Sequence, residues 1–345
     1  GIPQDSIMID YKVFLTSSSK ARGLKKTSKA CIIVIEPEDF NREQVSDLKK
    51  KGYNVLGYLN VGAIEDTRSY YNQLKPYRIQ KNGKPYQLDD WPHEWWIDIR
   101  RTRVRDFLVN RAKEIKKLGC DGFWCDNIDI YEYNKSDAMF EAITSILRRL
   151  KALGGYVMLN GGYKYLQEYM NKEMSGGVYK VQVGAFSVYD NAVSYKTELA
   201  IRGIKSVIKE YQIGNTLLYR VQVGAFSVFA NAYATMQKLM AIDINCFIVL
   251  EGSTFTERKL SDFVGGVTQE EVFTLIKDYS GKGKFGNQES SQSKEYQMHL
   301  VRLRVHDIDP FLLEYSRSAS KTKEIKDFCT DYGMEGYYVA SDVNL

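Results

Sequence analysis

The sequence predicts an α/β protein, a (β/α)8 TIM barrel, with a small α+β module inserted into it. Three observations point to this fold class. Eight short apolar runs alternate with amphipathic helical stretches along the chain. In the middle of that pattern, a 14-residue phrase occurs twice. The chain has 345 residues, and without the duplicated region its length is close to the roughly 250 residues typical of such a barrel.

The apolar runs are rich in β-branched residues and apolar on both faces, which is typical of parallel strands covered by helices. The eight runs are 31–35, 54–61, 95–99, 122–130, 156–160, 267–274, 311–315 and 336–340. Helical periodicity marks segments between them, at 41–51, 103–118, 136–152 and 319–331. The order of strand and helix is therefore the order that a (β/α)8 barrel requires.

The duplicated phrase predicts a repeated supersecondary unit. Residues 179–192 read YKVQVGAFSVYDNA and residues 219–232 read YRVQVGAFSVFANA, with 11 identical positions. Each copy begins with an alternating strand, turns at Gly-Ala-Phe-Ser, and continues as a helix and a second strand. Two βαβ repeats of this size predict one antiparallel sheet with its helices on one face.

The position of the repeats predicts the domain organisation. They lie between the fifth and sixth apolar runs, and the barrel pattern resumes after them. We expect residues 176–256 to form the inserted module. Residues 1–175 and 257–345 then form a discontinuous barrel domain.

Composition excludes several classes of function. The net charge of +5 does not by itself indicate nucleic acid, and no apolar run has the length of a membrane span. The five cysteines are widely scattered, and the three histidines have no HxH or HExxH spacing, so we expect neither a disulfide framework nor a zinc site. We also expect no cofactor. No secretory signal is visible at Gly1, which does not argue against export.

Acidic and amide side chains follow several of the predicted strands. In a barrel of this type the chemistry takes place at the carboxyl ends of the strands. Asp126 and Asp129 end the fourth run, Glu270 and Glu271 lie in the sixth, and Glu314 in the seventh. Carboxylates that converge on a barrel mouth favour acid–base work, and a carboxylate pair acting on a glycosidic bond is the leading interpretation. Other uses remain open: helix N-caps, ion pairs, and a magnesium site built from Asp126, Asp129 and Glu270.

The barrel segments resemble glycoside hydrolase family 114, the endo-α-1,4-polygalactosaminidase group. The matching phrases are VLGYLNVGAIEDTRSYY (55–71), WWIDIR (95–100), DGFWCDNIDIY (121–131), MLNGG (158–162), VTQEEVFT (267–274) and FLLEYS (311–316). The resemblance implies a TIM barrel that hydrolyses α-1,4-linked galactosamine-containing polysaccharide. It places the catalytic acids on Asp126 and Glu270, with Glu271 as an alternative to Glu270.

Six further residues are expected to line the same cleft and to bind the substrate, an amino-sugar polymer. They are Asn60, Arg68, Asp129, Asn160, Glu314 and Tyr315. A cationic amino sugar would explain the surplus of carboxylates there, since Asp129 or Glu314 can pair with its ammonium group.

The duplicated module resembles a SPOR (sporulation-related repeat) domain from about residue 178 to 252, on the strength of the phrase YxVQVGAFS, which occurs twice. Such domains bind peptidoglycan glycan strands. The resemblance implies that the strands carrying Gln182 and Gln222 form the sheet, and that sugars contact its exposed face. Gln182 and Gln222 are the expected peptidoglycan-binding residues.

Together these observations favour an extracellular or cell-wall-associated glycosidase whose partners are its polysaccharide substrate and peptidoglycan glycan strands. A peptidoglycan-directed glycosidase is the second interpretation. A non-catalytic polysaccharide-binding protein is the third, and the presence of both candidate acids disfavours it.

Overall fold

The computed structural model describes residues 8–345, so the first seven residues of the predicted barrel segment 1–175 lie outside the described residues. The chain divides into two compact units. One consists of Met8–Tyr169 and Lys259–Leu345, and the other includes Met170–Arg258. Among residues 8–345, no helix is both long and apolar enough to cross a membrane.

The larger unit contains a closed barrel of eight parallel strands in the order β1-β19-β18-β15-β10-β9-β3-β2, which confirms the predicted fold class. The strands are β1 (Ile9–Phe14), β2 (Cys31–Ile35), β3 (Asn54–Asn60), β9 (Gly122–Asp126), β10 (Tyr156–Asn160), β15 (Gly266–Glu270), β18 (Asp309–Tyr315) and β19 (Gly336–Ala340). Their inward-facing side chains fill the barrel, and Trp124 donates from Nε1 to the Tyr11 hydroxyl at its centre, over 2.9 Å.

One of the eight predicted strands is wrong. The run 95–99 does not enter the barrel: β8 (Trp91–Trp96) pairs antiparallel with β4 (Ala63–Glu65) and β7 (Gln87–Leu88) outside it. The missing barrel strand is β1, which pairs in parallel with β2 and β19. Its sequence, IDYKVF, alternates polar and apolar residues and so lacks the continuous apolar run that marks the other strands.

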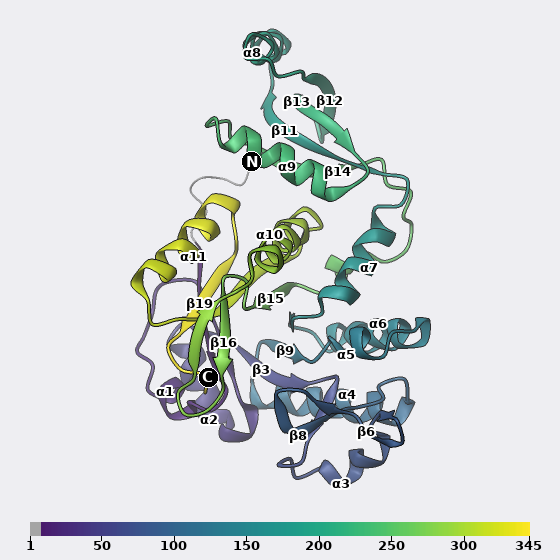
Figure 1. Cartoon of the computed structure of the whole chain (residues 1–345), viewed down its shortest axis with the longest axis vertical. Coiled ribbons are helices and arrows are strands. Elements are labelled where there is room, and N and C mark those ends of the chain that lie inside the picture. Colours follow the sequence, from purple (N-terminus) through teal and green to yellow (C-terminus); the bar gives the residue numbers. More distant parts are fainter. Residues whose placement is uncertain (1–7) are drawn as a thin grey trace. The chain divides into compact units, whose positions relative to one another are not determined.

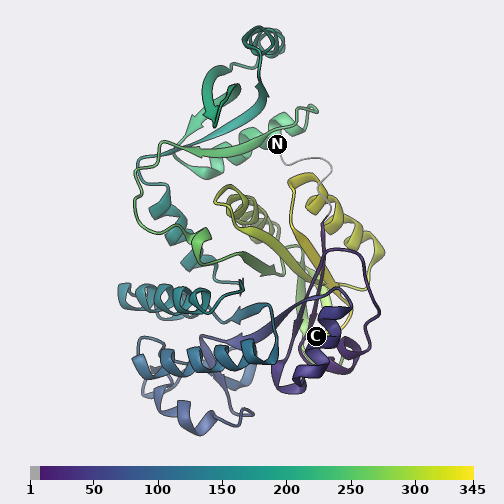
Figure 2. The same ribbon diagram turned by 180° about the vertical axis from the view of Figure 1, so that it is seen from behind.

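Helices follow the barrel strands, and α4 and α6 lie side by side on its outside (Figures 1 and 2). The helices are α1 (Ser18–Arg22), α2 (Arg42–Lys50), α4 (Thr102–Leu118), α5 (Ile130–Tyr133), α6 (Asp137–Ala152), α7 (Tyr163–Glu173), α10 (Ser290–Val305) and α11 (Ala319–Tyr332). Their ends follow local sequence signals. Asn41 and Gln44 form a capping box at the start of α2, and Gly119, at a φ of 109°, ends α4 in a left-handed conformation that suits glycine.

Two excursions extend the barrel at the carboxyl ends of its strands. The first follows β3 and contains β4, α3 (Tyr71–Leu74), β5 (Gln80–Lys81), β6 (Lys84–Pro85), β7 and β8, as well as the short 3-10 helix η2 (Lys75–Tyr77). The second follows β15 and is a hairpin of β16 (Thr274–Asp278) and β17 (Lys284–Asn287). Two further 3-10 turns, η1 (Pro37–Asp39) and η3 (Leu260–Asp262), lie after β2 and before β15.

The second unit contains a four-stranded antiparallel sheet in the order β12-β13-β11-β14, labelled in Figure 1. Its elements are β11 (Val178–Phe186), α8 (Tyr189–Ile201), β12 (Val207–Ile213), β13 (Thr216–Phe226), α9 (Phe229–Met240) and β14 (Phe247–Glu251). Both helices pack on β11 and β13. The two predicted βαβ repeats are therefore present and share one sheet.

Candidate active site

A cavity of about 560 Å³ opens at the carboxyl ends of the barrel strands. Five strands contribute a polar side chain to its wall: Tyr58 from β3, Asp126 from β9, Asn160 from β10, Glu270 from β15 and Tyr315 from β18. Its size lies in the range of small-molecule and saccharide-sized pockets. The cavity therefore collects, in one place, polar residues that are far apart in the sequence.

Asp126 and Glu270 are held by a single amide. The Asn160 Nδ2 donates to Asp126 Oδ1 over 3.0 Å and to Glu270 Oε2 over 2.8 Å. The two carboxylate oxygens are thus separated by at most the sum of those distances, 5.8 Å. Because the two N–H bonds of a planar amide diverge by about 120°, the separation is about 5 Å.

The two carboxyl groups have different hydrogen-bond partners. Asp126 also accepts from the Tyr58 hydroxyl over 2.7 Å and from the Asn127 backbone N–H over 3.0 Å, whereas Glu270 also accepts from the Tyr315 hydroxyl. Burial raises the pKa of both groups, and these hydrogen bonds oppose the rise. With one donor more, Asp126 is the better stabilised as a carboxylate.

Asp129 also lines the cavity. Its Oδ1 accepts from the Gly162 N–H over 3.0 Å, and burial raises its pKa to about 7. Gly161, at a φ of +75°, leaves the space that Asp129 needs, since a Cβ there would lie 2.5 Å from its Oδ2. From the sequence, a role of Asp129 as a helix N-cap remained open. Its side chain makes no capping hydrogen bond to α5, so it does not have that role.

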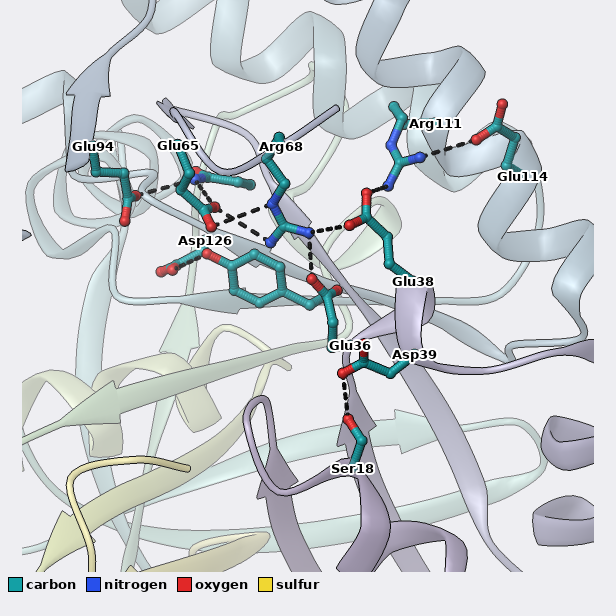
Figure 3. A network of polar contacts seen from close by, with 12 residues as sticks. Ser18, Glu36, Glu38, Asp39, Glu65, Arg68, Glu94, Arg111, Glu114 and Asp126 are labelled. Carbon is teal, nitrogen blue, oxygen red and sulfur yellow. Dashed lines mark hydrogen bonds and ion pairs between the residues drawn. The ribbon is translucent and has the colours of Figure 1, made fainter. Parts of the chain in front are cut away.

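Arg68 lines one side of the cavity within a cluster of glutamates (Figure 3). Its guanidinium contacts Glu36, Glu38 over 3.3 Å and Glu65 over 3.2 Å, and only 9% of the side chain is exposed. It also lies 5.7 Å from the centre of the Tyr58 ring. The single positive charge of Arg68 is therefore shared by three carboxylates and does not neutralise the cluster.

Asn60 lies behind the cavity wall and not among its lining residues. It is buried, donates from Nδ2 to Glu65 over 2.8 Å and to Glu94 over 3.1 Å, and accepts from Asn127 over 2.8 Å. Its predicted role as a lining residue is therefore wrong. Its amide holds the glutamates that do line the cavity.

The prediction that Glu314 lines the cleft is also wrong. The side chain is completely buried, and its two oxygens accept from the Val272 and Phe273 N–H groups over 2.7 and 2.8 Å. Tyr315, the next residue in β18, belongs to the barrel interior. Since successive residues of a strand point to opposite faces, Glu314 must point away from the cavity. It fixes the start of the β16–β17 hairpin.

Glu271 lines the cavity next to Glu270. It has a φ of 55°, and its Oε2 accepts from the Ile276 N–H over 3.1 Å. Burial and the charge of Glu270 raise its pKa to about 7. Unlike Glu270, Glu271 shares no hydrogen-bond donor with Asp126 among residues 8–345, and it braces the hairpin.

Gln182 and Gln222 are predicted to contact peptidoglycan, but the structure buries both side chains. They face each other across β11 and β13, but their exposed fractions are only 4% and 3%. The Gln222 amide donates to Glu251 Oε1 over 2.7 Å. Both side chains are too buried to contact a glycan strand, so this assignment is corrected.

Sequence reasoning missed several cavity residues. Tyr58, Glu36, Glu65, Glu94, Trp91, Gln269 and Tyr279 all line the cavity. Tyr58 lies two residues before Asn60 on the same strand, so strand alternation could have identified it. Glu94 and Trp91 come from an excursion whose path no local pattern predicts.

Replacing Glu94 by glutamine is expected to make the stability of the protein less dependent on pH. Burial, followed by the charges of Glu65 and Asp126, raises the pKa of Glu94 from 4.5 to about 8. Between these values the unfolded chain loses the proton while the folded chain keeps it, so stability falls as pH rises. Glutamine can still accept from Asn60 and Asn127.

The measurement is the Tm at about pH 5 and about pH 8. The wild-type Tm should fall over this interval, and the Tm of Glu94→Gln should fall less. Asp327→Asn, an exposed position on α11, is the control and should behave as wild type. An equal fall in Glu94→Gln and wild type would show that Glu94 does not bind the proton.

The cavity is strongly acidic, although the whole chain has a net charge of +5. Eight acidic side chains line it, namely Glu36, Glu38, Glu65, Glu94, Asp126, Asp129, Glu270 and Glu271. Among the described residues of its wall, Arg68 is the single cationic side chain. Within residues 8–345, no group of three or more His, Cys, Asp or Glu is arranged to hold a metal ion. The site is suited to a cationic ligand.

Comparison with known families gives two matches. Residues 9–179 match the model of glycoside-hydrolase family GH114, and residues 175–250 match the model of the SPOR domain. None of the curated proteins matches the sequence.

Two solved structures show the same architecture. The glycoside hydrolase domain of PelA from Pseudomonas aeruginosa has 13% identity and a TM-score of 0.57, over 97% of this chain and 96% of that one. Ega3 from Aspergillus fumigatus, in complex with galactosamine, has 13% identity and a TM-score of 0.51, over 99% and 94%. The peptidoglycan binding domain of the B. subtilis cell wall lytic enzyme CwlC has 35% identity over 22% of this chain and 92% of that domain, with a TM-score of 0.19.

Proposed function

Because residues 9–179 belong to glycoside-hydrolase family GH114 and residues 175–250 to the SPOR domain, we propose that the protein hydrolyses an α-1,4-linked galactosamine-containing polysaccharide while attached to peptidoglycan. The observation that carries the substrate class is the lining of the cavity, with eight acidic side chains and one arginine. Free amino groups on a polysaccharide are protonated near neutral pH, and charge-assisted hydrogen bonds to carboxylates recognise them. The complex of Ega3 with galactosamine is consistent with this choice.

Asp126 and Glu270 are the proposed catalytic pair. In its protonated form, Glu270 donates a proton to the glycosidic oxygen as the bond to the leaving sugar breaks. Asp126, with three donors on its carboxylate, attacks the anomeric carbon and forms a glycosyl-enzyme ester. Glu270, now ionised, takes a proton from the water that hydrolyses the ester, which restores both groups.

The separation of the two carboxylates favours retention of anomeric configuration. Retaining glycosidases place the pair about 5–5.5 Å apart, and inverting ones about 6.5–9.5 Å apart, to admit a water molecule. The limit of 5.8 Å set by the shared Asn160 amide falls with the retaining class. The same amide is the reason for assigning the second acid to Glu270 in preference to Glu271.

Asp129, Arg68, Asn160 and Tyr315 are the proposed substrate-binding residues of this cavity. Asp129 is the best placed of the four to receive an ammonium group, because within residues 8–345 the Gly162 N–H is the one hydrogen-bond donor to its carboxylate. An ammonium ion would stabilise its ionised form. N-acetylation would remove that charge and weaken binding.

The proposed role of residues 176–256 is attachment to glycan strands of the cell wall, which also implies an extracellular or wall-associated location. Lys180, Lys209 and Arg220 converge on Glu251 on one face of the sheet, leaving a positive surplus. Tyr211, 41% exposed, lies under the Arg220 guanidinium. Glycan strands without stem peptides expose lactyl carboxylates, which this face can attract.

Hydrolysis assays with three polymers test the function. The purified protein should release reducing ends from de-acetylated polygalactosamine, release fewer from the fully acetylated polymer, and release none from sacculi. Proton NMR of the first product should show the α-anomer. Release from sacculi alone would favour the peptidoglycan-directed glycosidase, and release from none of the three would contradict a glycosidase.

A further inference from the structure

A second cavity, of about 400 Å³, lies on the barrel unit beside the first. Asp89 and Asp90 line it from the turn between β7 and β8, Glu132 from α5 and Glu295 from α10. Neither Asp126 nor Glu270 belongs to its wall. It is therefore separate from the proposed catalytic pair and has no part in the chemistry described above.

The two cavities adjoin. Trp91, Asp129 and Gln269 line both of them. Trp91 is 50% exposed, and its ring meets the ring of Tyr279, from the β16–β17 hairpin, edge-on at 5.5 Å. A chain molecule bound at the catalytic pair can therefore continue past Trp91 into the second cavity. An aromatic ring at such a junction suits the apolar face of a sugar.

Gln269 provides an independent sign of a ligand. Its side chain is only 7% exposed, and its Nε2 donates to the Glu270 carbonyl over 3.1 Å. Its Oε1 is buried and has no hydrogen-bond partner within residues 8–345. Buried polar atoms are nearly always paired, so an acceptor left over in a cavity wall indicates a missing donor. A sugar hydroxyl or ammonium group is such a donor.

The lining of the second cavity matches the same ligand class as the first. Asp89, Asp90, Asp129, Glu132 and Glu295 contribute five carboxylates, and among the described lining residues Lys164 is the single cation. Trp96 and Tyr133 add a stacked aromatic pair with ring centres 4.7 Å apart. Carboxylates beside aromatic rings fit a sugar that carries a positive charge.

We propose that the second cavity is a distal binding subsite for the amino-sugar chain, which extends from the catalytic cavity past Trp91 and Gln269. This inference rests on the proposed function, because it names further units of the same cationic glycan as the ligand. It predicts that long substrates bind more tightly than short ones. It also predicts that this gain depends on carboxylates far from the bond that breaks.

The test uses the full chain with Glu270→Gln, in which the proposed function slows cleavage by about 10²- to 10⁴-fold, so that binding is measured before much of the oligomer is cleaved. Calorimetry compares an α-1,4-galactosamine trimer with an octamer. Against this background, Glu132→Gln and Glu295→Gln together remove two carboxylates of the second cavity without changing side-chain size. Asp327→Asn with Asp331→Asn, exposed on α11, removes the same charge elsewhere.

The octamer should bind more tightly than the trimer in the parent chain. The Glu132→Gln/Glu295→Gln pair should weaken octamer binding by roughly 2- to 30-fold, the range for two partly exposed ion pairs, and leave trimer binding unchanged. The control pair should change neither, and an N-acetylated octamer should lose the gain. A Gln269→Leu variant should likewise weaken the octamer more than the trimer.

Two results would overturn the inference: an octamer that binds no more tightly than the trimer, or an octamer affinity that the Glu132→Gln/Glu295→Gln pair leaves intact. Failure of the proposed function gives a different result. In that case the wild-type chain does not cleave the octamer, while the binding pattern above is still measured. Absence of binding by any galactosamine oligomer would overturn both.

Discussion

Replacing Glu270 by glutamine is expected to lower kcat on polygalactosamine by about 10²- to 10⁴-fold, the usual contribution of a general acid and base. Asp126→Asn should lower it further, because no glycosyl-enzyme ester can form without the nucleophile. Both amides can still accept hydrogen bonds from Asn160 and from the Tyr58 or Tyr315 hydroxyl. The fold should therefore persist, with unchanged circular dichroism.

The two roles can be separated by the leaving group. An α-galactosaminide with an acidic phenol as leaving group needs no proton from the enzyme, so Glu270→Gln should still form the ester rapidly with it. Added azide should then attack the ester and restore turnover, because azide needs no general base. Asp126→Asn should gain nothing from either change. Rescue of Asp126→Asn with retained configuration would contradict its role as nucleophile.

Glu271→Gln is the matched control for these experiments, since Glu271 is the neighbouring half-buried carboxyl in the same cavity. Its Oε2 accepts from the Ile276 N–H of the hairpin. We expect a change in KM greater than the change in kcat. Near-normal kcat in Glu270→Gln together with a large loss in Glu271→Gln would exchange the roles of the two glutamates.

The sequence predicts the barrel because its strand–helix alternation is a local property of the chain. Seven of the eight predicted runs contribute strands to the barrel, and β1 is missed because Asp10 and Lys12 interrupt its apolar pattern. Run 95–99 is misassigned because its tryptophan-rich sequence has the composition of a strand. Nothing local to that run distinguishes a barrel strand from an excursion that pairs antiparallel.

The candidate site could be predicted in part by the same logic. Asp126, Asn160 and Glu270 each end a barrel strand, and the structure brings them into contact through one amide. The prediction for Glu314 fails because successive side chains of a strand point to opposite faces. Tyr315 faces the barrel interior, so Glu314 faces away from it. The pairing of Arg68 with Glu36 depends on where the loops after β2 and β3 meet, which is a long-range property.

Removal of residues 176–256 is the second change with a large expected effect, the loss of binding to sacculi. The deleted segment contains the whole four-stranded sheet together with α8 and α9. Its ends are already close together, because the Thr254 N–H donates to the Ser175 carbonyl over 2.8 Å. A short Gly/Ser linker can therefore join the flanks without displacing the barrel strands.

The barrel should retain its kcat on soluble polygalactosamine after this deletion, since every residue of the catalytic cavity lies outside the deleted segment. Cleavage of polymer held on sacculi should fall, because attachment raises the local concentration of the barrel at that surface.

Lys209→Ala with Arg220→Ala tests the mechanism at the level of side chains and should weaken sacculus binding, most of all at low salt. Co-sedimentation with sacculi measures the binding of both variants. Binding as tight as that of the full chain after deletion would refute attachment through this module, and loss of soluble activity would mean that the module contributes to catalysis itself.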